Sequence, residues 1–590
     1  MDCKTNVRTT IRSLYQKNRR VFGGLYLYCL ILYLPLIVLR LTNCMDGMWD
    51  QDDHVAGAAE LRIGRWFWPY LDKLRLNISL DPLPAIVSLA LFVLGFLLVL
   101  EALQLRRSWI TCGAGVLFLS SPAVLCQLSY SYMSITFSTG FLLAVLAVWV
   151  PVVWVPAAWT SAEGVRTSAA GASAEPGRRL RRAFDPGILI SALLIAVMMG
   201  CYQAFLGVTC VLALFVFLLS VKRQRTLRPG FVFVLRMLIA LALGAVLYEL
   251  LLQANLTYYG ETMSDYNGAD SITFSGVLGN LPASIRHTYV SFRYYYGTSG
   301  SRFHALQGHR LFPVFYVVPI LGAVLLVVQT TAAELKGSSE KGRCFHAAVR
   351  GGLMLLALAV LPVFANSFFL LAVSAETQMQ MTGGMALSLP LVLCLWEEVL
   401  HADGAKASGS GCICREVNRE ISNKETSLQE SRQGVSRLLR LLCAAGTAAL
   451  IYGSAGQAAT DEYAMYVGRQ ATTTLARNVL NQFINSGTDY TEQVVMVYGQ
   501  PAQSPLFVHT ELYDKANYYA QYGSWASGTG ANRLCWFHFF GTQLRVNVNY
   551  ALDDTLETIY HSPEVAAMPV YPAAGSTANV WGVTVVKISE

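Results

Sequence analysis

The sequence predicts an all-α, polytopic membrane domain followed by a small C-terminal α/β domain. Hydrophobic residues make up 54% of the chain, charged residues only 14%, and the mean hydropathy is +0.42, which no ordinary soluble domain reaches. The apolar residues also gather in runs of about 20, the length of helix that crosses a bilayer core about 30 Å thick. After residue 457 these runs give way to mixed helical and alternating patterns.

About eleven membrane-spanning helices are predicted. Six runs are long and uninterrupted, at 21–41, 82–103, 137–157, 231–252, 311–328 and 438–455. Two runs that carry Gly or Pro, 109–126 and 353–373, and a shorter one at 382–396 add three more. The run 188–221 is too long for one span, and its polar Tyr202-Gln203 pair predicts a hairpin of two helices that meet there.

The distribution of Lys and Arg predicts how the chain crosses the membrane. If the N-terminus is cytoplasmic, alternate loops place 28 of the 44 Lys and Arg on the inner side. We therefore expect a multi-pass membrane protein with a cytoplasmic N-terminus and an extracytoplasmic C-terminal domain. The net charge of +7 then reflects topology, and no nucleic-acid partner is expected.

Two domains follow from this organisation. Residues 1–457 are predicted to form the membrane domain, with large outer loops at 43–81 and 258–310. Residues 458–590 are predicted to form the outer α/β domain. Within it, 461–484 and 553–560 have helical spacing, whereas 493–498 and 579–588 read as strands.

The first outer loop carries four acidic residues close together: Asp46, Asp50, Asp52 and Asp53. Crowded carboxylates repel one another, so we expect at least one of them to have the raised pKa that suits a general base. A solvated acidic loop or a helix cap would give the same pattern. In the same loop, the stretch Trp66-Phe67-Trp68 predicts an anchor in the membrane interface.

Other polar groups predicted on the outer side suggest an anionic ligand. Arg65, Arg286 and Arg293 are candidates to hold a phosphate, or else interfacial arginines that reach lipid headgroups. Glu376 lies on a short outer turn and either faces the same cavity or simply belongs to a polar turn. The Tyr202-Gln203 pair lies at membrane depth, where polar groups usually line a cavity.

Several short motifs resemble one known family. They are Trp49-Asp50-Gln51-Asp52-Asp53-His54, Gly64-Arg65-Trp66, Tyr202-Gln203-Ala204, Met568-Pro569-Val570-Tyr571-Pro572 and Val585-Val586-Lys587. Together they resemble the bacterial type II O-antigen glucosyltransferases, which are membrane glycosyltransferases of the GT-C type. The likeness runs from the first predicted helix to the last predicted strand, and it implies a location in the inner (plasma) membrane of a bacterium.

The resemblance implies transfer of a hexose, glucose in this family, from a polyprenyl-phosphate sugar donor to an envelope glycan acceptor on the outer face of the bilayer. It implies that an Asp of the first outer loop acts on the acceptor, and Asp52 and Asp53 match best, with Asp50 and Asp46 behind them. Arg65, Arg286, Arg293, Tyr202, Gln203 and Glu376 are the expected substrate-binding residues. We expect no cofactor and no protein metal site, and the sequence leaves a requirement for a divalent metal open.

A second class of function remains open at this point. A polytopic transporter or a flippase of lipid-linked sugars, without catalysis, would also be rich in apolar helices. Such proteins often carry internal repeats and charges inside their spans. This sequence shows no convincing repeat, and its candidate charges lie in the predicted outer loops, which favours the enzyme.

Overall fold

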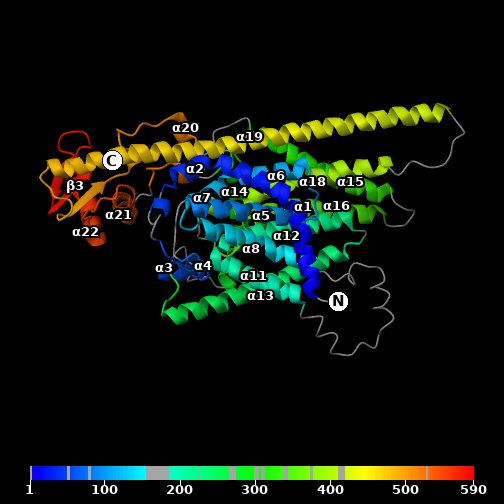
Figure 1. The fold of residues 1–590 in the computed structure, drawn as a ribbon, viewed down its shortest axis with the longest axis horizontal. Coiled ribbons are helices and arrows are strands. Elements are labelled where there is room, and N and C mark those ends of the chain that lie inside the picture. Colours follow the sequence, from blue (N-terminus) through cyan, green and yellow to red (C-terminus); the bar gives the residue numbers. More distant parts are fainter. Residues whose placement is uncertain are drawn as a thin grey trace.

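The structure, a computed structural model, describes residues 3–44, 46–48, 54–76, 82–153, 185–224, 226–264, 274–297, 304–306, 312–336, 343–372, 376–408, 419–525 and 529–590. Figure 1 shows a bundle of helices with a small sheet at one end, beyond the membrane-type helices. The N-terminus lies toward the opposite end of the bundle.

The first half of the chain is helical throughout the described ranges. Its elements are α1 (Cys3–Leu32), α2 (Leu34–Leu39), η1 (Asp46–Met48), α3 (Ala58–Arg62), α4 (Trp68–Leu74), α5 (Leu83–Ala102), α6 (Trp109–Leu119), α7 (Pro122–Ser129), α8 (Ser134–Val153), α11 (Pro186–Cys201), η3 (Gln203–Phe205), α12 (Leu206–Arg223), α13 (Arg228–Tyr259) and α14 (Phe274–Tyr296).

The second half begins with helices and ends in the small domain. Its helical elements are η5 (Phe312–Tyr316), α15 (Val317–Lys336), α16 (Arg343–Ala359), α17 (Leu361–Ala365), η6 (Ser367–Leu370), η7 (Met379–Met381), α18 (Gly383–Ser408), α19 (Arg419–Asn485), η8 (Pro501–Gln503), α20 (Glu511–Asp514), η9 (Tyr518–Ala520), α21 (Thr529–His538), η10 (Phe539–Gln543), α22 (Asp553–Tyr560) and α23 (Pro563–Ala567). Its strands are β1 (Val495–Tyr498), β2 (Thr577–Val580) and β3 (Val583–Lys587).

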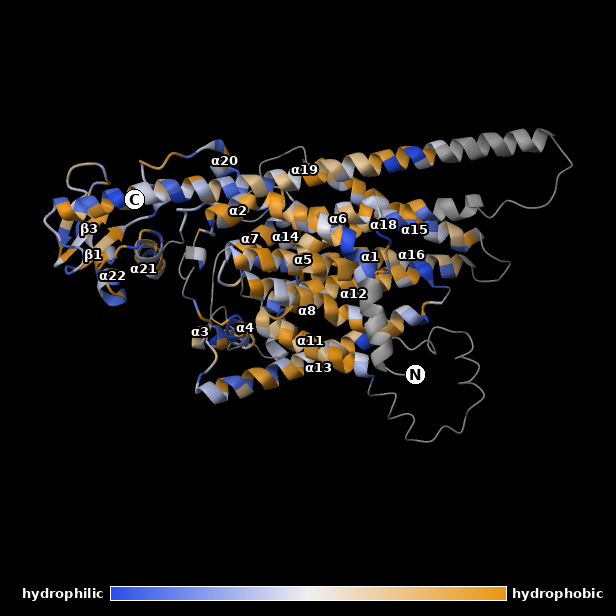
Figure 2. Ribbon diagram, viewed as in Figure 1, coloured by the Kyte–Doolittle hydropathy of each residue, from blue (hydrophilic) through white to orange (hydrophobic). Residues whose placement is uncertain are grey.

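Many helices have the length and composition of membrane spans. Within the described ranges, seven helices are long and apolar enough to cross a bilayer. They are α5, α8, η3 with α12, α13, η5 with α15, α18 and the apolar part of α19. Figure 2 shows that apolar residues dominate α5, α8 and α12 along most of their length. Apolar helices therefore stand at several of the predicted spans, and α5 and α8 lie within a few residues of the predicted bounds 82–103 and 137–157.

The surface of the bundle carries the apolar residues that a soluble protein would bury. On α13, Leu235 and Val246 are each 59% exposed, and on α15 Ile320 and Val328 are each 56% exposed. A contiguous apolar face of this size is expected where lipid, rather than water, is the neighbour. The helices therefore suit a membrane protein.

Four of the predicted spans take a less regular form. Helices α6 and α7, which cover 109–126, are bent by 45° at a break before Pro122, so they count as an eighth span only if the pair is taken together. The predicted span 353–373 is replaced by α16, which begins ten residues earlier, and by the short α17 and η6. Proline explains both breaks, since its ring removes an N–H donor and clashes with the preceding helical turn.

The remaining two departures lie at the N-terminus and in the predicted hairpin. The run 21–41 is shared between α1 and α2, which meet at Tyr33. The predicted hairpin is confirmed, because α11 ends at Cys201 and α12 begins at Leu206, with Tyr202 extended between them. Helix α11 has only 16 residues and is shorter than a full span.

The C-terminal domain is built on a three-stranded sheet in the order β1-β3-β2. Strand β3 pairs in parallel with β1, as Val495 opposite Thr584, and antiparallel with β2, as Val580 opposite Val583. The predicted strand 579–588 is thus a hairpin, with Trp581 and Gly582 at positive φ in its turn. Helix α22 lies where the sequence predicts it, at 553–560.

Helix α19 joins the two parts of the molecule. It runs without a break from Arg419 to Asn485, about 100 Å at 1.5 Å per residue, and includes the predicted span 438–455. The predicted boundary at 457/458 therefore falls inside one continuous helix. Figure 1 shows α19 along the bundle and into the sheet domain.

Candidate functional site

The break between α11 and α12 carries the first polar contacts of the candidate site. The side-chain amide of Gln203 donates to the backbone oxygen of Ile63, at 3.0 Å, and to the hydroxyl of Tyr248, at 3.2 Å. Tyr248 in turn donates to the backbone oxygen of Gly64, at 3.0 Å. The loop after α3 is therefore tied to the tip of the hairpin and to the distal end of α13.

Gly64 makes this close approach possible. Its φ is +83°, and a Cβ added to it would lie 2.4 Å from the Tyr248 hydroxyl and 2.6 Å from the Gln203 amide nitrogen. A side chain at this position would clash and would also strain the backbone. Glycine is required here, and the turn it makes directs the next residue, Arg65, toward the bundle.

Arg65 lies among aromatic rings, and no ion pair joins it to a carboxylate of the described residues. Its guanidinium carbon is 4.9 Å from the ring centre of Tyr202 and 5.9 Å from that of Trp68. Its Nε is buried and has no hydrogen-bond partner within the described ranges. Cation–π contacts of this kind hold the charge in place and leave its N–H donors available to a ligand.

Asp46 is the acidic partner of this arginine in the described part of the loop. It lies in η1 and accepts a hydrogen bond from Tyr130, and the positive charge of Arg65 acts on it. Burial raises the pKa of the Asp46 carboxyl, and the Tyr130 hydrogen bond and the Arg65 charge offset part of that rise. A carboxylate in such surroundings is suited to take a proton from a hydroxyl.

The three predicted catalytic residues, Asp50, Asp52 and Asp53, lie outside the described residues. The chain on both sides of them is described and lies in the candidate site. Asp46 precedes them, and His54 follows with its ring 4.6 Å from that of Tyr132 and 5.3 Å from that of Trp68. The His54 Nε2 also lies 3.3 Å from Glu60 Oε1. The described residues on either side of the acidic segment, Asp46 and His54, therefore lie near Arg65 and Trp68.

Sequence reasoning missed a second buried arginine in this loop. The Arg75 side chain is only 10% exposed, its Nε is 2.9 Å from Asp72 Oδ1, and both terminal nitrogens lack hydrogen-bond partners among the described residues. Asp72 also accepts a hydrogen bond from the Ala56 N–H, at 2.8 Å, next to His54. The sequence feature that could have identified this arginine is Asp72, three residues earlier, at a spacing that lets the two side chains pair at the end of a short helix.

The interpretation of Trp66 and Trp68 as a membrane anchor is wrong. Trp66 is 6% exposed and Trp68 only 1% exposed. Trp66 packs beside Gly200 at the end of α11, where the Phe67 N–H donates to the Gly200 oxygen at 2.9 Å. Both rings are buried because the loop folds back onto the bundle, an outcome that composition alone does not predict.

The structure does not bring all the predicted binding residues together. Arg286 and Arg293 are exposed on α14, which packs against α17 and η6, and no hydrogen bond or ion pair between described residues joins them to Arg65. Glu376 is exposed and precedes Thr377, whose hydroxyl contacts Ser291 of α14 at 2.9 Å. These three residues belong to a neighbouring surface.

A family model named Glucosyl transferase GtrII matches residues 45–388, which is more than half of the chain. The protein belongs to this family. The matched region of this GtrII protein begins one residue before Asp46 and contains Arg65, Arg75, Tyr130 and the α11–α12 tip, so the candidate site lies wholly inside it. Family membership means that the chain is a glycosyltransferase, and a sugar donor and an acceptor follow from that.

The rest of the GtrII chain lies outside the match. The region after residue 388 comprises most of α18, the long helix α19 and the sheet domain. Comparison with curated proteins and with solved structures gives no match.

Proposed function

We propose that this protein transfers a hexose from a polyprenyl-phosphate sugar to an envelope glycan, at the end of the bundle that carries α3, α4 and the α11–α12 tip. Figure 1 places these elements at the end nearer the sheet domain. The positive-inside pattern supports assigning this end to the outer face of the inner membrane. The sheet domain is then positioned to receive the acceptor glycan.

The observation that carries the proposal is the environment of the Arg65 side chain. A half-buried arginine that rests on two aromatic rings, with a buried Nε that has no partner among the described residues and a carboxyl of raised pKa nearby, is poorly explained as a purely structural group. An arginine with free donors matches a phosphate oxygen, and a lipid-linked phosphate would enter from the apolar surroundings.

The chemistry is a single displacement. A carboxylate of segment 46–53 takes the proton of the acceptor hydroxyl as its oxygen attacks the anomeric carbon. The bond from that carbon to the phosphate oxygen breaks, and Arg65 stabilises the departing lipid phosphate. Attack from one face inverts the anomeric centre. The sequence ranks Asp52 and Asp53 first as base and Asp50 next, and the environment of Asp46 makes it a fourth candidate.

The test is transfer of radiolabelled glucose from polyprenyl-phosphate-glucose to envelope glycan in membranes that contain the native chain. We expect Arg65→Lys to lower kcat/KM by roughly 10- to 100-fold, because a lysine keeps the charge but loses the fork of donors. Among single Asp→Asn variants at 46, 50, 52 and 53, the base should lose about 10²- to 10⁴-fold in kcat.

Arg62→Lys is the matched control for the arginine variant. Arg62 lies on the same loop, is half exposed and pairs with Glu261 at 3.1 Å, so its variant should transfer at the native rate. Native membranes that transfer glucose from a nucleotide sugar in the absence of any lipid carrier would contradict the donor assignment. Equal effects of Arg65→Lys and Arg62→Lys would contradict the role of Arg65.

A further inference from the structure

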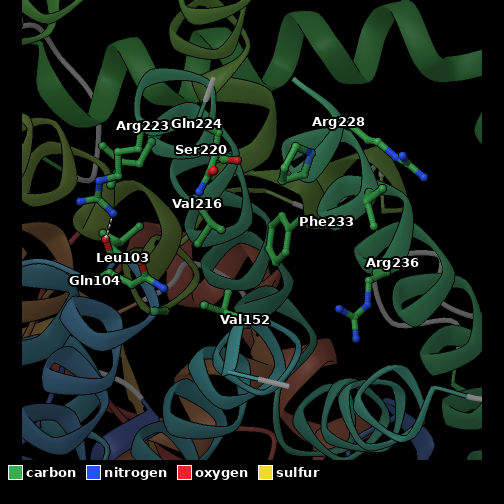
Figure 3. Close-up of a pocket in the computed structure, with 14 residues that line it drawn as sticks. Leu103, Gln104, Val152, Val216, Ser220, Arg223, Gln224, Arg228, Phe233 and Arg236 are labelled. Atoms are coloured by element: carbon green, nitrogen blue, oxygen red, sulfur yellow. Dashed lines mark hydrogen bonds between the residues drawn. The ribbon is translucent and has the colours of Figure 1, made fainter. Parts of the chain in front are cut away.

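A cavity of about 180 Å³ lies at the end of the bundle opposite the candidate site. It opens between the end of α5, α8, α12 and the start of α13 (Figure 3). Arg228, at its rim, is the first residue of α13, and Tyr248 of the candidate site lies 20 residues further along the same helix, about 30 Å away. The two sites are therefore separate.

The lining of this cavity is amphiphilic. Figure 3 shows Val152, Val216 and Phe233 around its floor, with arginines set around them. The polar lining residues are Gln104, Ser220, Arg223, Gln224, Arg228 and Arg236, and no Asp or Glu of the described residues lines the cavity. An apolar floor below a cationic rim, at the ends of apolar helices, matches a lipid with a charged headgroup better than a small soluble anion.

The three arginines differ in how far their charge is compensated. Arg223 pairs with Glu398 and donates to the Leu103 oxygen at 2.7 Å. Arg236 pairs with Asp185, but its side chain is only 10% exposed and its Nε has no hydrogen-bond partner in the described part of the chain. Glu398 and Asp185 thus compensate the charges of two of the three lining arginines, and the charge of the third has no such partner among the described residues.

That remaining charge is Arg228. Its side chain is exposed, and no hydrogen bond or ion pair to another described residue is found for it. It stands at the N-terminus of a 32-residue helix, where free backbone N–H groups add to the positive potential. The rim therefore favours an anion.

We propose that this cavity binds one anionic phospholipid, with its phosphate at Arg228 and the first turn of α13 and an acyl chain along Val152, Val216 and Phe233. Such a lipid would fix α13 against α8 and α12. Helix α13 is the element that carries Tyr248, so the lipid would stabilise the scaffold of the candidate site without taking part in the transfer. The proposal concerns lipid binding and does not depend on which sugar is transferred.

The experiment uses the purified full-length protein in nanodiscs that contain phosphatidylcholine with a small fraction of phosphatidylglycerol. Native mass spectrometry counts the lipids that stay bound, and thermal unfolding reports the stabilisation that binding gives. We expect one retained phosphatidylglycerol per chain. Arg228→Gln should lower its retention about fivefold, as expected for one cation near a lipid headgroup.

Two further variants distinguish this site from general surface charge. Arg437→Gln removes an exposed arginine of α19 that does not line the cavity, and it should leave retention unchanged. Val216→Trp keeps every charge but fills the apolar floor, and it should lower retention as Arg228→Gln does. Size-exclusion chromatography and circular dichroism confirm that each variant is folded.

Three results would overturn the proposal. The first is equal retention of phosphatidylcholine and phosphatidylglycerol by the native protein. The second is an equal loss in Arg437→Gln and Arg228→Gln. The third is evidence that only an anion is bound. That evidence would be either native retention of phosphatidylglycerol by a folded Val216→Trp variant or stabilisation by inorganic phosphate alone that equals stabilisation by the lipid.

Discussion

Arg65 and Asp46 show how single residues acquire reactivity from their surroundings. Arg65 is held by the faces of Tyr202 and Trp68, and within the described ranges no carboxylate forms an ion pair with it. Asp46 is held by Tyr130 in a buried position that raises the pKa of its carboxyl. An arginine that stabilises a leaving phosphate and a carboxylate that accepts a proton are the two groups that sugar transfer from a lipid phosphate needs.

The raised pKa of Asp46 predicts the acid limb of the pH–rate profile. If Asp46 is the base, it must be ionised, and its ionised fraction falls as the pH drops through the raised pKa. The acid limb of kcat/KM should then lie above the pH range in which an ordinary, solvated aspartate titrates, which is about pH 4. The profile should be measured with the native protein and with Asp46→Asn.

An unchanged acid limb in Asp46→Asn, with substantial activity retained, would assign the base to Asp50, Asp52 or Asp53 instead. Asp554→Asn, on α22 in the sheet domain, is a suitable control because its exposed carboxylate is remote in the chain from the first outer loop. It should leave both the rate and the profile unchanged.

At the scale of elements, the site depends on three segments that meet at Gly64. The distal end of α13 extends past the bundle and holds the loop through Tyr248 and through Asn255, which accepts a hydrogen bond from Tyr70 at 2.7 Å. The α11–α12 tip contributes Gln203. A loop fixed from two sides in this way can keep Arg65 oriented before the substrate arrives, which lowers the entropic cost of binding.

Gly64→Ala should therefore damage both stability and activity. The positive φ and the two contacts under 3 Å together should cost about 2–5 kcal/mol, and transfer should fall as the loop moves. Gly57→Ala is a matched control on the same loop, because its φ is −147° and its Cβ would meet only one atom, at 4.0 Å.

Thermal unfolding and sugar transfer should be measured for both glycine variants. If Gly64→Ala unfolds and transfers like Gly57→Ala, the contacts of Tyr248 and Gln203 do not set the position of Arg65.

For the whole molecule, the decisive element is α19, which connects the bundle to the sheet domain. Its Asp461 is fully buried and accepts hydrogen bonds from Gln457, from Tyr519 and from both the backbone and side chain of Asn517, all at 2.8–2.9 Å. Further on, Arg469 donates to the Leu39 and Arg40 oxygens at the end of α2, both at 2.8 Å. These bonds hold the 515–520 segment and α2 against one helix.

Asp461→Ala should loosen this junction. Its removal leaves buried donors without an acceptor, which should cost roughly 3–5 kcal/mol. Hydrogen exchange at the amides of 515–520 should become much faster, while the sheet core around Val495 stays protected. Glu511→Ala, whose side chain is 82% exposed, should change neither. Unchanged exchange in Asp461→Ala would show that the junction is held by apolar packing alone.

The membrane character, most spans, the α11–α12 hairpin and the family resemblance could all be predicted from the sequence. The length and period of an apolar run depend on local composition. A run long enough to cross the bilayer core as a helix can therefore be recognised directly from the sequence. The same is true of α22 and of the strand that became β1, whose patterns are local. Arg65, Tyr202 and Gln203 are three of the six predicted substrate-binding residues, and in the structure Arg65 lies over the Tyr202 ring while Gln203 bonds to the loop just before Arg65.

Only the tertiary structure decided which polar groups share a site. It placed Asp46 near Arg65, buried Trp68 against the guanidinium of Arg65, and left Arg286, Arg293 and Glu376 exposed, with no hydrogen bond or ion pair to Arg65 among the described residues. It also merged the last predicted span and the start of the C-terminal domain into one helix, α19. These outcomes depend on contacts between residues far apart in the sequence, such as Gln203 with Ile63 and Asp461 with Asn517, and local pattern carries no information about them.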